Sequence, residues 1–262
     1  MLDTTMPLTT RVAIPAKKGH TVFLELFTQP KPILAMLHLK GTTRDDILAR
    51  ALREADIYAA CGVDAVIVED YFGDVTDVEN VLALLRRERP QMVIGVNVLD
   101  DFAKSYELAA QYGAQFMQVD SICGHLTPED EHDYFAMVDH HRADGRVAVI
   151  GGVRFKYQQY RSGRSLAEDL AIGRRHCDAI AVTGSGTGVD TDTDKIREFR
   201  QHLGDFPLVI GAGMTVAQVS EKLTLTDAAI VGSTFKETRK DSGEVSAAHV
   251  QEFMDAVRRE FR

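Results

Sequence analysis

Two acidic residues are the strongest candidates for chemistry in this amino-acid sequence. Glu69 and Asp120 each follow a run of apolar residues, in the segments AVIVE and FMQVD. Two carboxyl groups in unlike surroundings can divide into a proton donor and a proton acceptor, as sugar and enol chemistry requires. We therefore predict acid–base catalysis by this pair. The structural alternative is a salt bridge from either acid to Arg154 or Lys156.

Three other polar residues follow apolar runs and complete the predicted catalytic set: His38, Asn97 and Lys156. His38 can serve as a second general base, as a ligand of a divalent metal ion together with Glu69 and Asp120, or as a hydrogen-bonded core histidine. Asn97 is expected to orient a substrate hydroxyl group. These residue types are compatible with a divalent metal ion, but no cofactor is certain from the sequence.

Small residues follow the last three apolar runs and predict a phosphate site. Glycine lets the backbone approach an oxyanion closely, and a helix that starts after the turn adds unpaired N–H groups. In α/β barrels the loops after strands seven and eight often bind phosphate together. The alternative is that these glycines only tighten the turns. The predicted phosphate-binding residues are Gly184, Gly211, Ala212, Gly213, Gly232 and Ser233.

Short apolar, β-branched runs alternate eight times with longer amphipathic segments, which predicts eight βα units. Two helix-start signals, Ser165 with Glu168 and Thr215 with Gln218, have the spacing of a capping box. The predicted strands are 33–39, 65–69, 92–99, 116–122, 147–153, 179–183, 208–211 and 228–232.

The two kinds of segment differ in polarity, which favours a barrel over other α/β folds. The helical segments are apolar on one stripe, for instance at Ile196, Phe199 and Leu203, whereas the strands are apolar on both faces. We predict an α/β protein with a single (β/α)8 TIM barrel over residues 31–262 and a short N-terminal extension over residues 1–30. An open doubly wound sheet is the alternative, but its glycine-rich loop usually follows the first strand.

Composition and charge exclude several classes of protein. The chain has 262 residues, 45% of them hydrophobic, and a formal net charge of -9 at pH 7. An acidic chain is not built to neutralise nucleic-acid phosphates or anionic lipid, so we predict no nucleic-acid partner and no membrane insertion. The three widely spaced cysteines are expected to be reduced packing groups. We expect a cytoplasmic protein that forms a homo-oligomer, as barrels often do.

Three segments outside the predicted strands have open assignments. Residues 154–164 hold four cations and three aromatic rings, so they can form a lid over an anionic substrate, a solvated loop or a subunit contact. Residues 235–245 are rich in charge and are expected to be exposed. Residues 1–29 can close the bottom of the barrel or join a neighbouring subunit.

Several short motifs resemble the BtpA family in order and spacing from residue 31 onward. The resemblance implies a barrel fold and two functional classes, because the family is named for photosystem I biogenesis and also occurs beside sugar-transport and sugar-metabolism genes. This sequence departs from the family pattern at residues 39–43 and 100–101, so the resemblance does not identify a substrate. The motifs are MLH (36–38), GVDAVIVE (62–69), FGD (72–74), GVNVL (95–99), DAIAVTG (178–184), TG (187–188), GAGMT (211–215) and VGS (231–233).

We predict an enzyme that acts on a phosphorylated small molecule, either a sugar phosphate or a nucleoside-like phosphate. Its phosphate group would bind the loops after strands seven and eight, and acid–base chemistry would carry an isomerisation, a lyase reaction or a glycosidic cleavage. One alternative is a non-catalytic biogenesis or assembly factor that uses the barrel as a scaffold and exposes an apolar patch on its N-terminal segment. Another is a phosphate-dependent sensor.

Overall fold

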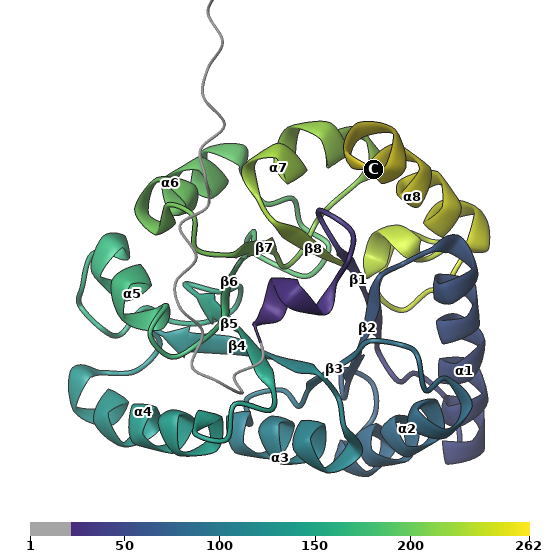
Figure 1. Ribbon diagram of the computed structural model, residues 1–262, viewed down its shortest axis with the longest axis horizontal. Helices are drawn as coiled ribbons and strands as arrows, with labels where there is room; N and C mark the ends of the chain where they lie inside the picture. The colour runs from purple at the N-terminus through teal and green to yellow at the C-terminus, as the bar shows by residue number, and fades with distance from the viewer. Residues whose placement is uncertain (1–21) are drawn as a thin grey trace, which may run out of the picture.

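Eight parallel strands close into a barrel in this computed structural model, which describes residues 22–262 (Figure 1). Each strand pairs with the next one along the chain, and β8 returns to pair with β1. This closed barrel confirms the predicted TIM-barrel fold, and the alternative of an open doubly wound sheet is wrong. The strands are β1 (Ile33–Leu37), β2 (Ala65–Glu69), β3 (Ile94–Asn97), β4 (Phe116–Cys123), β5 (Ala148–Val153), β6 (Ala179–Val182), β7 (Leu208–Ile210) and β8 (Ala228–Val231).

Within the same residues, eight α-helices form a ring outside the barrel, each in the connection that follows a strand (Figure 1). The predicted capping boxes are confirmed, at Ser165 with Glu168 and at Thr215 with Gln218. The α-helices are α1 (Arg44–Cys61), α2 (Val75–Glu88), α3 (Phe102–Tyr112), α4 (Pro128–Arg142), α5 (Leu166–Gly173), α6 (Thr193–Leu203), α7 (Val219–Leu225) and α8 (Ala247–Phe261). Three short 3-10 helices are η1 (Phe23–Leu26), η2 (Val216–Gln218) and η3 (Ser233–Phe235).

Alternation along the strands separates the apolar side chains into two cores. Every second residue of a strand points into the barrel, so Leu34 and Phe116 pack inside, while their chain neighbours pack between the sheet and the helices. Phe23 of η1 joins the inner core, where its ring lies edge-on to Phe116 at 5.8 Å between centroids. Figure 1 shows η1, in purple, across the centre of the barrel. Residues 1–21 of the predicted extension lie outside the described residues.

The connection between β8 and α8 is exposed at residues 237–240, 242 and 244, as expected of the segment 235–245, but the first two residues of this segment are buried. Phe235 is fully buried because its ring packs against Phe253 of α8. Lys236 is buried because its Nζ lies 3.1 Å from Oε1 of Glu54 in α1, which neutralises its charge. The first residues of this connection therefore belong to the packing between the sheet and the helices.

Cys61, Cys123 and Cys177 all lie within the described residues. All three cysteines are free and buried, which confirms the prediction that they are packing groups. Within residues 22–262, every helix is too short or too polar to span a lipid bilayer.

Candidate active site

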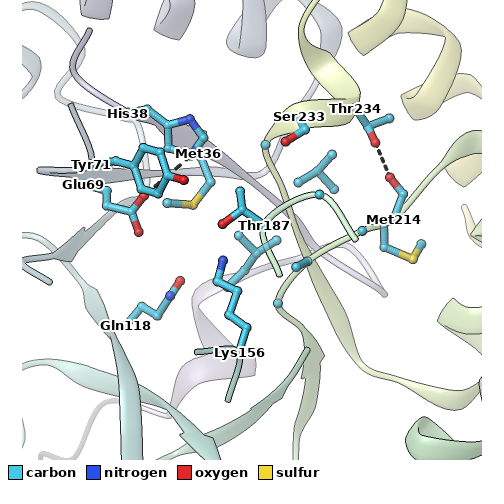
Figure 2. Close-up of a pocket in the computed structure, with 17 residues that line it drawn as sticks. Met36, His38, Glu69, Tyr71, Gln118, Lys156, Thr187, Met214, Ser233 and Thr234 are labelled. Atoms are coloured by element: carbon cyan, nitrogen blue, oxygen red, sulfur yellow. Dashed lines mark hydrogen bonds and ion pairs between the residues drawn. The ribbon is translucent and has the colours of Figure 1, made fainter. Parts of the chain in front are cut away.

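A cavity at the C-terminal ends of the strands brings three predicted catalytic residues, His38, Glu69 and Lys156, together with the glycine turns (Figure 2). The second predicted acid, Asp120, does not line it. The space between its walls amounts to about 510 Å³, including the part open to solvent. Figure 2 shows His38 and Glu69 on one side and Ser233 on the other, with Lys156 reaching in between. Residues of the predicted catalytic set and of the predicted phosphate site thus line the same cavity.

Strand alternation explains which polar side chains enter this cavity. Glu69 follows Ile67 by two residues in β2, so it shares the inward face of that strand. His38 follows Met36 with the same spacing just after β1, and Gln118 occupies an inward position of β4. Apolar side chains fill the inward positions at the N-terminal ends of these strands, and polar ones take over at the C-terminal ends. Polar chemistry is therefore concentrated at one mouth of the barrel.

Hydrogen bonds connect the acids of β2 and β4 through Asn97 of β3. The Nδ2 atom of Asn97 donates to Glu69 Oε1 at 2.8 Å and to Asp120 Oδ1 at 3.3 Å. The Nε2 atom of Gln118 donates to the same oxygen of Asp120 at 3.0 Å. Glu69 and Gln118 line the cavity, whereas Asn97 and Asp120 do not line it and contact them through these hydrogen bonds. The predicted contact of Asn97 with a substrate hydroxyl stays a prediction.

Burial changes the protonation of these groups. Burial and the nearby charge of Asp120 raise the pKa of Glu69 to about 8, so this carboxyl group is largely neutral at pH 7. Burial also raises the pKa of Asp120, while the charge of Lys156 and two amide hydrogen bonds oppose that shift. Burial and the charge of Lys236 lower the pKa of His38 to about 3. At neutral pH, Glu69 can therefore donate a proton and His38 carries no charge.

The predicted metal ligands do not converge into one set. Within residues 22–262, no three histidine, cysteine, aspartate or glutamate side chains lie close enough together to hold a metal ion. The Nε2 atom of His38 does lie 3.6 Å from Oε2 of Glu69. Because burial keeps both groups neutral at pH 7, this pair is a polar contact rather than a salt bridge.

The two glycine turns leave little or no room for a side chain at Gly213 and Gly232. Gly213 has a φ of 74°, and a Cβ atom there would overlap the carbonyl oxygen of Val189. A Cβ atom at Gly232 would lie 3.2 Å from Cε1 of His38. Among residues 22–262, the backbone N–H groups of Gly213 and Ser233 have no hydrogen-bond acceptor. Free donors at a cavity wall can bind the oxygen atoms of an anion.

One predicted phosphate-binding residue lies away from the cavity. Gly184 follows β6 but does not line the cavity; it packs against the carbonyl oxygen of Asp190. The other five predicted residues, in the turns at 211–213 and 232–233, do line it. Gly184 therefore supports the segment that packs on Gly213 instead of facing the cavity.

Sequence reasoning missed several residues that line the cavity, including Gln118, Tyr71 and Thr187. Gln118 had a usable signal, because it lies two residues before Asp120 and so shares its strand face. Tyr71 and Thr187 lie in loops, and hydrogen bonds between loops hold them at the mouth. The hydroxyl of Tyr71 donates to Asp241 Oδ2 at 2.9 Å, and the backbone N–H of Thr187 donates to the hydroxyl of Tyr157 at 2.8 Å.

Ion pairs anchor the segment 154–164, which was expected to be a lid, a solvated loop or a subunit contact. Arg154 and Arg164 both pair with the fully buried Asp169, at N···O distances of 3.3 and 3.1 Å. Arg154 therefore pairs with Asp169 and not with either predicted catalytic acid. Lys156 is the cation of this segment that reaches the cavity (Figure 2). Closure of the segment over a ligand stays a prediction.

Several solved structures share the barrel fold. The native KDPGal structure has a TM-score of 0.62 and 16% identity, over 87% of this chain and 95% of the other. Phosphoribosyl anthranilate isomerase from Thermus thermophilus has a TM-score of 0.59 and 15% identity, over 87% and 98% of the two chains. N-acetylmannosamine-6-phosphate 2-epimerase from Clostridium perfringens has a TM-score of 0.55 and 11% identity, over 79% and 89%. At these identities the likeness shows the fold alone.

Relatives in sequence cover nearly the whole chain. An uncharacterised protein of Thermococcus kodakarensis is 26% identical over 252 residues, which cover 87% of this chain and 95% of the relative. The photosystem I biogenesis protein BtpA of Synechocystis is 22% identical over 258 residues, which cover 89% and 90%. The model of the BtpA family matches residues 29–259, the region that contains the motifs of the sequence. This chain belongs to the BtpA family.

Proposed function

We propose that this chain is an enzyme acting on a phosphorylated small molecule, either a sugar phosphate or a nucleoside-like phosphate. The observation that carries the proposal is the shared cavity, which the turns 211–213 and 232–233 line together with the buried Glu69 (Figure 2). A ligand whose phosphate binds at the turns would present its other end to this carboxyl group. Two proteins of the same fold are named for phosphorylated compounds, the phosphoribosyl anthranilate isomerase and the N-acetylmannosamine-6-phosphate 2-epimerase, which supports the proposal.

In this proposal the phosphate binds to backbone and side-chain donors at the two turns. The free N–H groups of Gly213 and Ser233 would donate to phosphate oxygens, and the hydroxyl of Ser233 would add a third donor. The ammonium group of Lys156 supplies a positive charge within the same cavity. Hydrogen bonds to a charged acceptor are about twice as strong as neutral ones. The proposed phosphate residues are therefore those of the two turns, and Gly184 acts only through packing.

Glu69 is the proposed proton-transfer residue, because it is the predicted acid that lines the cavity. Its pKa of about 8 lets it hold a proton at neutral pH and exchange it with a substrate. Asp120 would act through Glu69, since its charge raises that pKa and Asn97 links the two carboxyl groups. Neutral His38 would bind a hydroxyl group, and Lys156 would stabilise a developing oxyanion. These roles suit an isomerisation, a lyase reaction or a glycosidic cleavage.

Thermal unfolding tests the phosphate site. Inorganic phosphate and phosphosugars should raise the melting temperature relative to potassium chloride at equal ionic strength, because a ligand that binds only the folded chain stabilises it by about 2.7 kcal/mol at roughly a hundred times its Kd. Ser233→Asp should abolish this rise by placing a carboxylate at the turn. Gln201→Glu, at an exposed position of α6, should leave it intact. No shift across a panel of phosphorylated compounds would contradict the proposal.

Turnover tests the catalytic half of the proposal. Incubation with the phosphosugars that raise the melting temperature, followed by phosphorus and proton NMR, should reveal a product with the wild-type chain. Glu69→Gln should lose this turnover and retain the ligand-induced shift in melting temperature. A variant that turns over as fast as the wild type would show that Glu69 is not the proton-transfer residue.

A non-catalytic assembly factor is the second candidate, supported by the name of the Synechocystis relative. An apolar patch was expected on the N-terminal segment, of which residues 1–21 lie outside the described part of the chain. A double variant, Glu69→Gln with Asp120→Asn, separates the candidates in a deletion strain. Full complementation would end the enzymatic proposal, and loss of complementation by a folded variant would support it. Within residues 22–262, large apolar side chains are exposed only on the loops after β2, β5 and β6, at Phe72, Tyr157, Tyr160 and Val189.

A further inference from the structure

One buried amide at the cavity has a polar atom that no other residue satisfies. Gln118 is 4% exposed and lines the cavity beside Lys156 (Figure 2). Its Nε2 atom donates to Asp120 Oδ1 at 3.0 Å. Its Oε1 atom is buried and has no hydrogen-bond partner in the part of the chain that the structure describes. A buried amide oxygen without a donor costs free energy, and a ligand that supplies the donor removes that cost.

The neighbouring acid determines the orientation of this amide. A carboxylate accepts hydrogen bonds and does not donate them, so the nitrogen of Gln118 faces Asp120. The same oxygen of Asp120 also accepts from Nδ2 of Asn97 at 3.3 Å, so it accepts two hydrogen bonds. The oxygen of Gln118 is left as the free end of the amide, and Figure 2 shows it pointing toward the cavity.

We infer that Gln118 Oε1 accepts a hydrogen bond from a hydroxyl group of the substrate, and that the substrate is a phosphorylated polyhydroxy compound of the sugar phosphate class. This inference rests on the proposed function, and it makes Gln118 a specificity-determining residue. Glu69 lines the same cavity, so a substrate that reaches Gln118 also meets the proposed proton-transfer group.

A hydroxyl group fits this end of the cavity better than an apolar group or a carbonyl group. It both donates and accepts, so it can donate to Gln118 Oε1 and accept from the ammonium group of Lys156, which points to the same end (Figure 2). An apolar group would leave both partners unsatisfied. A carbonyl group would accept from Lys156 but would give Gln118 no donor.

A panel of phosphates tests the inference on the wild-type chain by titration calorimetry. Ribose 5-phosphate, glucose 6-phosphate and glycerol 3-phosphate present hydroxyl groups, whereas phenyl phosphate presents an apolar ring on the same anion. At least one of the polyhydroxy phosphates should bind about tenfold more tightly than phenyl phosphate, the advantage expected of one well-made hydrogen bond. Equal or tighter binding of phenyl phosphate than of all three would overturn the inference.

Gln118→Met supplies the second test, because it keeps the length of the side chain and removes the amide. The variant should lose about tenfold in affinity for the best polyhydroxy phosphate and less than about twofold for inorganic phosphate. Gln201→Met, at an exposed position of α6, is the matched control and should change neither affinity. If Gln118→Met binds the polyhydroxy phosphate as tightly as the wild type does, the inference is wrong, but the proposed phosphate site is not contradicted. If inorganic phosphate does not bind the wild type, the proposed function fails and the inference falls with it.

Discussion

Replacement of Glu69 by glutamine should make the folded chain more resistant to rising pH. Burial and the charge of Asp120 raise the pKa of Glu69 from 4.5 to about 8. Below pH 4.5 this group is protonated in both the folded and the unfolded chain. Between pH 4.5 and about 8 only the unfolded chain gives up the proton, so unfolding becomes more favourable as the pH rises. Above pH 8 both forms are ionised and the dependence ends.

The size of this effect follows from the two pKa values. Each pH unit in this window costs about 1.4 kcal/mol of the free energy of unfolding. From pH 4.5 to 8 the wild type should therefore lose about 5 kcal/mol through Glu69. Glu69→Gln cannot ionise at this position, so its stability should exceed that of the wild type by an amount that grows to about 5 kcal/mol across the window.

Urea unfolding of the two chains between about pH 5 and pH 9 measures this difference. The difference between Glu69→Gln and the wild type removes the contribution of other titrating groups, and Glu198→Gln, at an exposed position of α6, is the matched control. The control should follow the wild type at every pH. Parallel curves for the wild type and Glu69→Gln would refute the claim that burial holds this carboxyl group neutral.

Two further substitutions, and one control, test the turn at 211–213 and the segment 154–164. Gly213→Ala should destabilise the fold by about 3 kcal/mol and abolish phosphate binding, since the new methyl group would overlap the carbonyl oxygen of Val189. Gly163→Ala, with a φ of 68° but open space around it, should cost only about 1 kcal/mol; equal losses in urea unfolding would contradict this reasoning. Asp169→Asn should cost about 2 kcal/mol by weakening the bonds of Arg154 and Arg164 to this buried side chain, although Arg164 keeps its pair with Glu131. Limited proteolysis should then cut that segment faster, and an unchanged cleavage rate would contradict its anchoring role.

The candidate site shows which of its parts could be predicted from the sequence. Glu69, His38 and the turn at 211–213 were predictable because each ends an apolar run, and the ends of parallel strands meet at one mouth of a barrel. Gln118 could have been predicted from the alternation of side chains along β4, because it lies two residues before Asp120. Gly184 follows a strand too, yet it packs against Asp190 and does not face the cavity. Position after a strand therefore selects candidates but does not determine which way a loop residue faces.

Burial of charged groups was harder to predict than the order of the elements. Lys236 follows a strand in a segment rich in charge, but it is buried because Glu54, far away in the sequence, lies 3.1 Å from it. Asp169 is buried in the same way, beside the partly buried side chains of Arg154 and Arg164. From the sequence a charged residue is predicted to be exposed, because the oppositely charged partner that allows its burial belongs to another element.

The sequence by itself determined the eight βα units, their barrel arrangement and the positions of the glycine turns. These features depend on periodicity and on spacing between near neighbours, which are present in the chain before it folds. Only the tertiary structure decided that Asn97 joins Glu69 to Asp120, that Gln118 keeps a free oxygen, and that the pKa of Glu69 rises to about 8. These properties depend on desolvation and on contacts between different strands, so they exist only once the barrel has closed.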